Sequence, residues 1–194
     1  MKLSSLYKKA LRAKRQYLHP WCAAIIVAAG SATRMNGVDK IQADLCGQPV
    51  LCRTLAAFER CELVDEMIVV TRREQMERVS ELCVTYPKVQ MVVCGGETRV
   101  DSVCAGIAAV SEQTQLIAVH DGARPLITEE LITKTADKAA KFSAAAPAIP
   151  VKDTIKAADA EGFSASTPDR STLWQIQTPQ AFQFRLIYGA YEKM

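Results

Sequence analysis

The sequence predicts an α/β fold with a mostly parallel sheet and helices on both of its faces. Apolar runs of five to eight residues alternate along the chain with longer stretches whose apolar residues recur at helical spacing. These runs are apolar on both faces, which is typical of parallel strands covered by helices. With 194 residues, of which 49% are hydrophobic, the chain is long enough to bury a sizeable core in one domain.

The expected strands and helices follow each other in turn. Strands are expected at residues 23–29, 67–71, 90–94, 116–120 and 144–151. Helices are expected at residues 49–60, 74–85, 99–111 and 129–141. A last helix begins near residue 184 and has no capping residue after it, so we expect the natural chain to extend beyond Met194.

Residues 152–171 interrupt this alternation. The segment is polar and contains Gly162 and Pro168. A structureless loop of about 20 residues is rare in a compact domain, so an excursion with its own hairpin is the alternative to an exposed loop. The next stretch, residues 169–180, surrounds Trp174 with polar side chains and is expected to be a surface loop.

The net charge of +3 comes from a basic N-terminal extension, residues 1–21. Its first 15 positions hold six basic residues and no acidic one, and without them the chain has more acidic than basic side chains. We therefore expect no nucleic-acid partner, because such proteins carry a basic patch on the folded body. No apolar run reaches the roughly 20 residues that span a bilayer, so no stable membrane association is expected. The extension itself is expected to be solvated, with weak binding to a membrane surface or a partner as the alternative.

The seven cysteines indicate a reducing compartment. Their number is odd, no C-x-x-C motif occurs, and only two histidines are available, so a zinc site has poor ligand spacing. Reduced thiols in a cytoplasmic protein are the simplest interpretation.

The most informative stretch runs from Val27 to Lys40. An expected strand leads directly into a loop of small residues around Gly30, and Arg34 and Lys40 follow. Such a loop lets backbone N–H groups approach a phosphate chain, whose charge the two cations neutralise. Neither the dinucleotide-binding G-x-G-x-x-G nor the P-loop G-K-[ST] is present. The stretch is consistent with a triphosphate site, and an ordinary turn after a strand is the alternative.

Two later segments also follow expected strands. Asp121 is suited to a divalent metal and Arg124 to an anion, although a turn capped by Asp121 is the alternative. The two glycines at 95–96 precede a helix whose N-terminus favours anions, although Thr98 as a plain N-cap is the simpler interpretation. Because ligands gather beyond the carboxyl ends of parallel strands, these segments are expected to lie near the Gly30 loop.

Together these segments resemble the 2-C-methyl-D-erythritol 4-phosphate cytidylyltransferases of the non-mevalonate isoprenoid pathway. The matching motifs are Ala28-Ala29-Gly30…Arg34-Met35…Lys40, Gly95-Gly96-Glu97…Arg99…Asp101-Ser102-Val103, His120-Asp121-Gly122-Ala123-Arg124-Pro125, Val151-Lys152-Asp153-Thr154-Ile155-Lys156, and Leu173-Trp174 followed by Gln177-Thr178-Pro179-Gln180. Their order along residues 23–194 makes the set more specific than any one of them. The resemblance implies a nucleotidyltransferase domain at 22–194, with a Rossmann-like, mostly parallel sheet and a protruding β-arm at about 152–171.

The resemblance also implies a role for each site residue. Arg34 and Lys40 would be catalytic residues that flank the α-phosphate of CTP, and Asp121 would hold Mg²⁺. The nucleotide would be bound by Ala28, Ala29, Gly30, Ser31, Gly96, Glu97 and Ser102. The second substrate, a sugar-alcohol phosphate, would be bound by Asp121, Arg124, Thr154, Arg170 and Thr178. The family's arm clasps a second subunit, so a homodimer is implied in which Thr154 and Arg170 reach the partner subunit's substrate.

The sequence departs from the family pattern at three places. Ala32 replaces a loop glycine and is expected to narrow the loop, and Asp39 replaces a proline and is expected to weaken the hold of Lys40 on a phosphate. The family also continues into a further strand that carries an active-site Asp and Lys, so a C-terminal strand and helix are missing from residues 22–194.

The resemblance implies transfer of CMP from CTP to 2-C-methyl-D-erythritol 4-phosphate, which releases pyrophosphate. An attacking phosphate has a second pKa of about 6, so it needs no strong general base near pH 7. Two alternatives stay open at this point: a ribitol 5-phosphate cytidylyltransferase, and a catalytically silent module for nucleotide binding or dimerisation.

Overall fold

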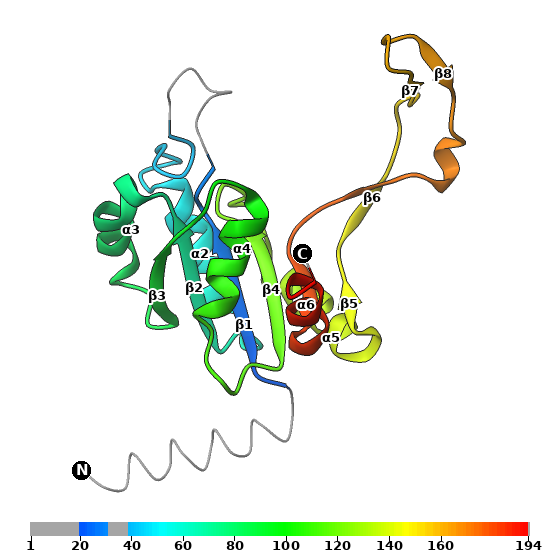
Figure 1. Ribbon diagram of the computed structural model, residues 1–194. Helices are drawn as coiled ribbons and strands as arrows, with labels where there is room; N and C mark the ends of the chain where they lie inside the picture. The colour runs from blue at the N-terminus through cyan, green and yellow to red at the C-terminus, as the bar shows by residue number, and fades with distance from the viewer. Residues whose placement is uncertain (1–19, 31–38, 194) are drawn as a thin grey trace, which may run out of the picture.

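The central feature of the computed structural model is a six-stranded sheet in the order β3-β2-β1-β4-β10-β5 (Figure 1). The model describes residues 20–30 and 39–193. The strands are β1 (Cys22–Val27), β2 (Glu66–Thr71), β3 (Val89–Cys94), β4 (Leu116–Asp121), β5 (Ala144–Ala145) and β10 (Gln180–Gln183). β1 pairs in parallel with β2 and β4, β2 pairs in parallel with β3, and β10 runs antiparallel to both β4 and β5. The predicted Rossmann-like, mostly parallel sheet is therefore confirmed.

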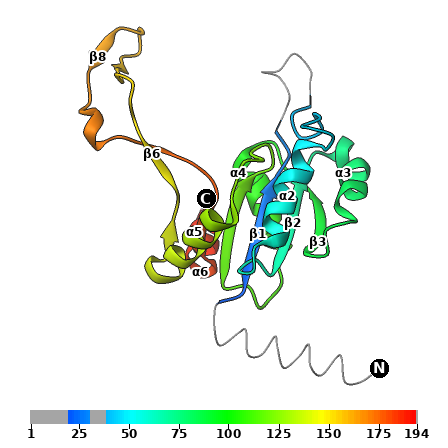
Figure 2. The same cartoon turned by 180° about the vertical axis from the view of Figure 1, so that it is seen from behind.

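Helices cover both faces of the sheet. Figure 1 shows α4 in front of the strands, and Figure 2 shows α2 on the opposite face. The described helices are α2 (Val50–Arg60), α3 (Met76–Cys83), α4 (Arg99–Ala108), α5 (Glu129–Phe142) and α6 (Phe184–Tyr191). Ile26 of β1 packs in one cluster with α2, α3 and α5, while the neighbouring Ile25 packs in another with α4 and α6. This alternation explains why β1 is apolar along its whole length. None of the described helices is long and apolar enough to cross a bilayer.

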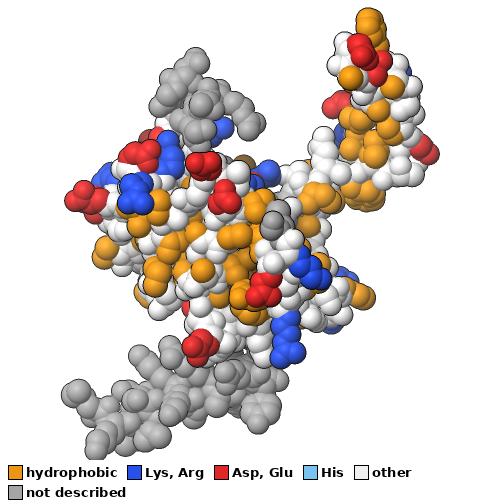
Figure 3. All heavy atoms as spheres, viewed as in Figure 1, with side chains coloured by type: hydrophobic (Ala, Val, Ile, Leu, Met, Phe, Trp, Pro, Cys, Tyr) orange, Lys and Arg blue, Asp and Glu red, His pale blue; other side chains and the backbone are white. Residues whose placement is uncertain are grey.

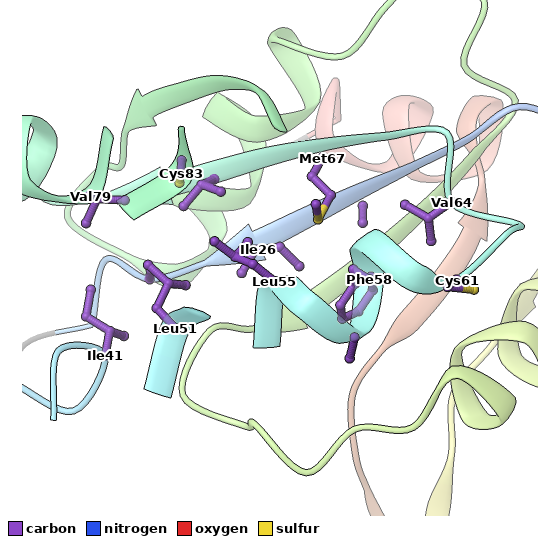
Figure 4. Close-up of a cluster of buried hydrophobic side chains, with 14 of the residues drawn as sticks. Ile26, Ile41, Leu51, Leu55, Phe58, Cys61, Val64, Met67, Val79 and Cys83 are labelled. Atoms are coloured by element: carbon purple, nitrogen blue, oxygen red, sulfur yellow. The ribbon is translucent and has the colours of Figure 1, made fainter. Parts of the chain in front are cut away.

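The larger core cluster fixes α2 against the sheet (Figure 4). Leu51, Leu55 and Phe58 project from one side of α2 and are fully buried against Ile26 and Met67. Each such side chain contributes about 1.5–3 kcal/mol when it is removed from water. The ends of β1 and β2 are therefore held on a close-packed layer, which gives the loops that follow them a rigid base.

Most predicted elements are confirmed, with ends that differ by up to three residues. The expected helix at 74–85 begins as a short 3₁₀ turn, η2 (Arg73–Gln75), and continues as α3. The helix expected near residue 184 is α6. All seven cysteines are free thiols. The N-terminal extension lies outside the described residues except for its last two positions.

Two predictions about the C-terminal third are wrong. The single strand expected at 144–151 is divided into β5 and β6 (Ala148–Pro150), which belong to different sheets. Pro147 separates them, and proline has no N–H to continue a ladder. The surface loop expected at 169–180 contains the 3₁₀ turn η3 (Arg170–Thr172) and the strand β9 (Trp174–Ile176), and its last residue begins the interior strand β10.

Residues 148–176 form an arm that extends away from the sheet (Figure 1). β6 pairs with β9 at its base, and a hairpin of β7 (Ala157–Ala158) and β8 (Ser164–Ser166) forms its tip. The predicted excursion with its own hairpin is thus confirmed. The arm leaves the body on the side where the parallel strands end, which is also where the candidate site lies.

Candidate active site

A cavity of about 700 Å³ opens at the carboxyl ends of β1, β2, β3 and β4. Most of the predicted site residues line it, namely Ala28, Ala29, Gly30, Lys40, Gly96, Glu97, Ser102, Asp121 and Arg124. Four segments that are distant in the sequence meet here because parallel strands end at the same edge of the sheet. Ser31, Ala32 and Arg34 lie outside the described residues.

The remaining predicted residues lie elsewhere. Thr178 is buried next to the cavity wall, two residues before β10 begins at Gln180. Thr154 and Arg170 are exposed on the arm and do not line this chain's cavity. The Arg170 guanidinium donates to the Lys152 carbonyl oxygen at 3.1 Å, a contact within the arm.

Glycine is required at position 95 by close packing. A methyl group there would lie 2.7 Å from the Ser102 hydroxyl oxygen and 2.8 Å from the Ala29 Cβ, both closer than real Cβ atoms approach. Gly30 is different, because a Cβ at that position would meet no atom of the described residues within 4 Å. Gly95 therefore allows the end of β3 and the first turns of α4 to approach Ala29, which follows β1.

The N-terminus of α4 faces the cavity with its cap satisfied. Thr98 accepts the Asp101 backbone N–H at 3.1 Å, and Asp101 accepts the Thr98 backbone N–H at 2.9 Å, so the two form a capping box. The predicted N-cap at Thr98 is confirmed. Arg99 follows it and lines the cavity as well.

Asp121 joins two arginines at the end of β4. The Arg124 Nε donates to one carboxylate oxygen at 2.8 Å, and an Arg99 Nη atom donates to the other at 3.4 Å. Arg124 also donates to the Gln177 side chain. Arg99 was not among the predicted site residues, although an arginine in the first turn after a strand-end glycine pair is a usable signal for an anion site.

A magnesium ion fits this residue set. Within the described residues, no three His, Cys, Asp or Glu side chains come together as a metal cluster. Mg²⁺ is usually held by one or two carboxylates together with substrate phosphates, and it does not require a protein cage. The single carboxylate of Asp121, beside two arginines that can transfer to phosphate oxygens, is such a partial site.

His120 supports the wall of the cavity from within the core. It is 1% exposed, and its Nε2 lies 3.2 Å from the Arg124 carbonyl oxygen, which can only accept a hydrogen bond. The Nδ1 atom therefore accepts, and the Thr178 hydroxyl donates to it at 2.9 Å. The same hydroxyl oxygen accepts the Asp121 backbone N–H at 3.5 Å. This network ties Thr178, two residues before β10, to the strand that carries Asp121.

Burial lowers the pKa of His120 to about 4 from its ordinary 6.5, because desolvation disfavours the charged ring. As the pH falls from 7 to 4, the unfolded chain takes up a proton at this residue near pH 6.5, while the folded chain takes one up only as the pH approaches 4. We expect the free energy of unfolding to fall across this window by on the order of 3 kcal/mol from this residue. Urea unfolding at a fixed protein concentration should show a flatter pH dependence for His120→Asn than for the natural chain. A constant gap between the two curves from pH 7 to pH 4 would contradict this account.

The carboxylate of Asp39 does not bond to the Lys40 ammonium. Asp39 accepts from an Nη atom of Arg72 at 2.7 Å and from the Ile41 backbone N–H at 3.2 Å. Within the described part of the chain, no side chain forms an ion pair or hydrogen bond with Lys40, which lines the cavity. The pairing on which the expected weakening of Lys40 depends is therefore absent. Arg72 also lines the cavity and was not predicted, although it directly follows an expected strand.

Comparison with known proteins identifies the relatives of this chain. The family model described as IspD: 2-C-methyl-D-erythritol 4-phosphate cytidylyltransferase matches residues 22–194. The enzyme of that name from Caldanaerobacter subterraneus subsp. tengcongensis is 45% identical over 174 residues, which are 88% of this chain and 77% of the relative. The enzyme of that name from Lachnospira eligens is 43% identical over 174 residues, 88% of this chain and 76% of the relative.

Solved structures agree with this relationship. The 4-diphosphocytidyl-2C-methyl-D-erythritol synthase of Anaerococcus prevotii superposes with a TM-score of 0.79 at 35% identity, over 90% of this chain and 74% of that one. The 2-C-methyl-D-erythritol 4-phosphate cytidylyltransferase of Thermus thermophilus gives a TM-score of 0.66 at 29% identity, over 90% and 75% of the two chains. Most of the predicted site residues line one cavity at the strand ends, and the family model matches residues 22–194, so the chain belongs to the 2-C-methyl-D-erythritol 4-phosphate cytidylyltransferase family.

Proposed function

We propose that this chain transfers CMP from CTP to 2-C-methyl-D-erythritol 4-phosphate and gives 4-diphosphocytidyl-2-C-methyl-D-erythritol and pyrophosphate. The observation that carries the proposal is the 700 Å³ cavity, where Lys40, Asp121 and Arg124 lie around the Gly30 loop in a member of this family. A cavity of this volume is of the size that holds small-molecule substrates.

The chemical step is an in-line displacement at phosphorus. A phosphate oxygen of the sugar-alcohol phosphate forms a bond to the α-phosphorus of CTP, and the bond from that phosphorus to the bridging oxygen breaks. The electron pair of the broken bond leaves with pyrophosphate. The attacking phosphate is already largely ionised near pH 7, so no general base is required. This agrees with the position of His120, whose two ring nitrogens are both hydrogen-bonded in the core.

The residues of the cavity then act by positioning and by charge. Lys40 supplies a positive charge, and no side chain of the described residues pairs with its ammonium. Arg124 and Arg99 supply two more positive charges beside Asp121. Asp121 would hold Mg²⁺, which when bound contributes positive charge to the triphosphate. Fixed positive groups of this kind stabilise the charge that accumulates at the transition state.

The assignment is tested by following pyrophosphate release from CTP and Mg²⁺. We expect release with 2-C-methyl-D-erythritol 4-phosphate and little or none with ribitol 5-phosphate, together with the two phosphorus signals of a disubstituted diphosphate in ³¹P spectra. Release that is faster with ribitol 5-phosphate would favour that substrate. Binding of CTP without release with either substrate would indicate a silent nucleotide-binding module.

We also propose that the arm joins two copies of the chain in a homodimer. Several large apolar side chains are exposed on it, including Phe163, Trp174 and Ile176 at 73%, 56% and 55% (Figure 3). Isolated two-stranded ribbons are marginally stable in water, and exposed apolar patches usually mark contact surfaces. A second copy would cover the arm and bring the partner subunit's Thr154 and Arg170 towards this chain's cavity.

Light scattering tests the dimer directly. Trp174 and Ile176 lie two residues apart on β9 and so share one face, and lysine at both positions should give a monomer. The control is Val84→Lys, because Val84 is 81% exposed on the body and away from the arm. A monomeric natural chain would refute the dimer, and a double variant that stays dimeric would refute the arm as its interface.

The free thiols indicate the cellular compartment in which the protein works. All seven cysteines are free, and reduced thiols persist in reducing compartments. We propose the cytoplasm on this ground.

A further inference from the structure

The ion pair between Asp39 and Arg72 lies in the wall of the cavity, beside Lys40. Arg72 directly follows β2, and Asp39 directly precedes Lys40, so the pair joins residues 33 positions apart. The two side chains are 21% and 27% exposed, so they are partly shielded from solvent. Within the described part of the chain, Asp39 provides the carboxylate that bonds to Arg72.

Other contacts already hold the Lys40 segment in place. Ile41 is 6% exposed and packs in the larger core cluster, and its carbonyl oxygen accepts the Leu51 backbone N–H at 2.9 Å. The Ala43 carbonyl oxygen accepts the Val50 backbone N–H at 3.0 Å. The side chain of Gln42 donates to that of Gln75, which is a second link to the turn after β2. The segment therefore does not depend on the ion pair for its position.

What the pair controls is charge. The carboxylate of Asp39 is next to Lys40 in sequence, in a cavity where opposite charges attract more strongly than in bulk water. An Asp39 without a partner is therefore a competitor of the nucleotide phosphate for the Lys40 ammonium. Arg72 occupies that carboxylate at 2.7 Å and leaves Lys40 available.

We propose that Arg72 is a positioning residue that acts through Asp39: it is the counter-ion that prevents Asp39 from neutralising Lys40. This inference rests on the proposed function for its catalytic consequence, because it assigns to Lys40 a role at the phosphates. It also explains how a chain with Asp39 before Lys40 retains a usable cation there.

Kinetics of four variants test the inference: Arg72→Met, Asp39→Asn, the double variant, and Arg73→Met. Arg73 is the matched control, since it is the adjacent arginine, is exposed, and does not line the cavity. Complete loss of one charge-stabilising donor typically costs about 10²–10³ in rate, so partial neutralisation of Lys40 in Arg72→Met should lower kcat by about tenfold. We expect a smaller change in KM for CTP, because the charge matters most at the transition state.

The double variant distinguishes charge compensation from other roles of Arg72. We expect Asp39→Asn to restore most of the kcat lost in Arg72→Met, and to have little effect alone. If Arg72 contacted the substrate directly, the double variant would stay as slow as Arg72→Met. If the pair only anchored the segment, Asp39→Asn alone would be as slow as Arg72→Met. Either result would overturn the proposal.

A second measurement does not depend on activity. The rate of acetylation of Lys40 by acetic anhydride, relative to the exposed Lys141 and followed by mass spectrometry, reports whether the amine is held by a carboxylate. We expect slower labelling of Lys40 in Arg72→Met and recovery in the double variant. Unchanged labelling would refute the charge compensation even if the chain transfers CMP. If the labelling follows the expected pattern but the natural chain releases no pyrophosphate, the proposed function is refuted and the role of Arg72 as counter-ion of Asp39 is not.

Discussion

Replacement of Lys40 by glutamine is expected to lower the turnover of CTP by about 10²–10³ and to leave the fold intact. Lys40 lines the cavity, and no described side chain competes for its ammonium. Loss of one fixed donor to a developing negative charge typically has this effect on the rate. Glutamine keeps a long, polar side chain, one atom shorter than that of lysine, so the main change is the loss of the positive charge. Steady-state pyrophosphate release at saturating substrates measures it.

The matched control for Lys40→Gln is Lys141→Gln. Lys141 is an exposed lysine in the last turn of α5, on the body but outside the cavity. We expect the control to keep natural turnover, and both variants to unfold at the natural temperature. If folded Lys40→Gln turned over CTP at the natural rate, Lys40 would have no role in the reaction. The role proposed for Arg72 would then fail as well, because it acts on Lys40.

Asp121→Asn is expected to have the other large effect, a loss of about 10²–10³ in rate together with a higher requirement for Mg²⁺. Asparagine keeps the size of the side chain and its oxygen but removes the negative charge. A neutral ligand holds a hard divalent cation less well, and the two arginines beside it lose their counter-ion. Titration of the rate with Mg²⁺ at fixed CTP should show the midpoint moving to higher concentration.

The control for Asp121→Asn is Asp137→Asn, at an exposed position of α5. We expect its Mg²⁺ midpoint to equal that of the natural chain. A lower rate in Asp121→Asn with an unchanged midpoint would assign to Asp121 only the orientation of Arg99 and Arg124, and would refute its role as a metal ligand.

The elements that could be predicted from the sequence are those whose own residues show a clear apolar pattern. β1 and β2 are short apolar runs followed by small or polar residues, and their core positions follow directly from that pattern. The loop around Gly30, the Gly95 turn and Asp121 could be placed together because each follows such a run. Parallel topology then brings them to one edge without any further information.

The rest depended on contacts between distant residues. Gln180-Ala181-Phe182-Gln183 has no strong strand pattern, and only pairing with β4 on one side and β5 on the other makes it a strand. The ion-pair partner of Asp39 could not be inferred from the sequence. Nothing near Asp39 in the chain indicates that Arg72, 33 residues away, binds its carboxylate in place of the adjacent Lys40. Arg99 has a local signal, its place in the first turn after the glycine pair, but its contact with Asp121 arises only when the fold brings the start of α4 to the end of β4.

The position of β10 has a consequence for synthesis on the ribosome. β10 lies between β4 and β5, yet about 60 residues separate the end of β4 from its start. At about 5–20 residues per second, the edge of β4 stays unpaired for several seconds while the arm is being made. Thr178, which reaches His120 and Asp121, is translated just before β10. The wall of the cavity is therefore completed only after β10 has been made, so a nascent chain held before residue 178 should contain β1 to β4 and still lack a finished site.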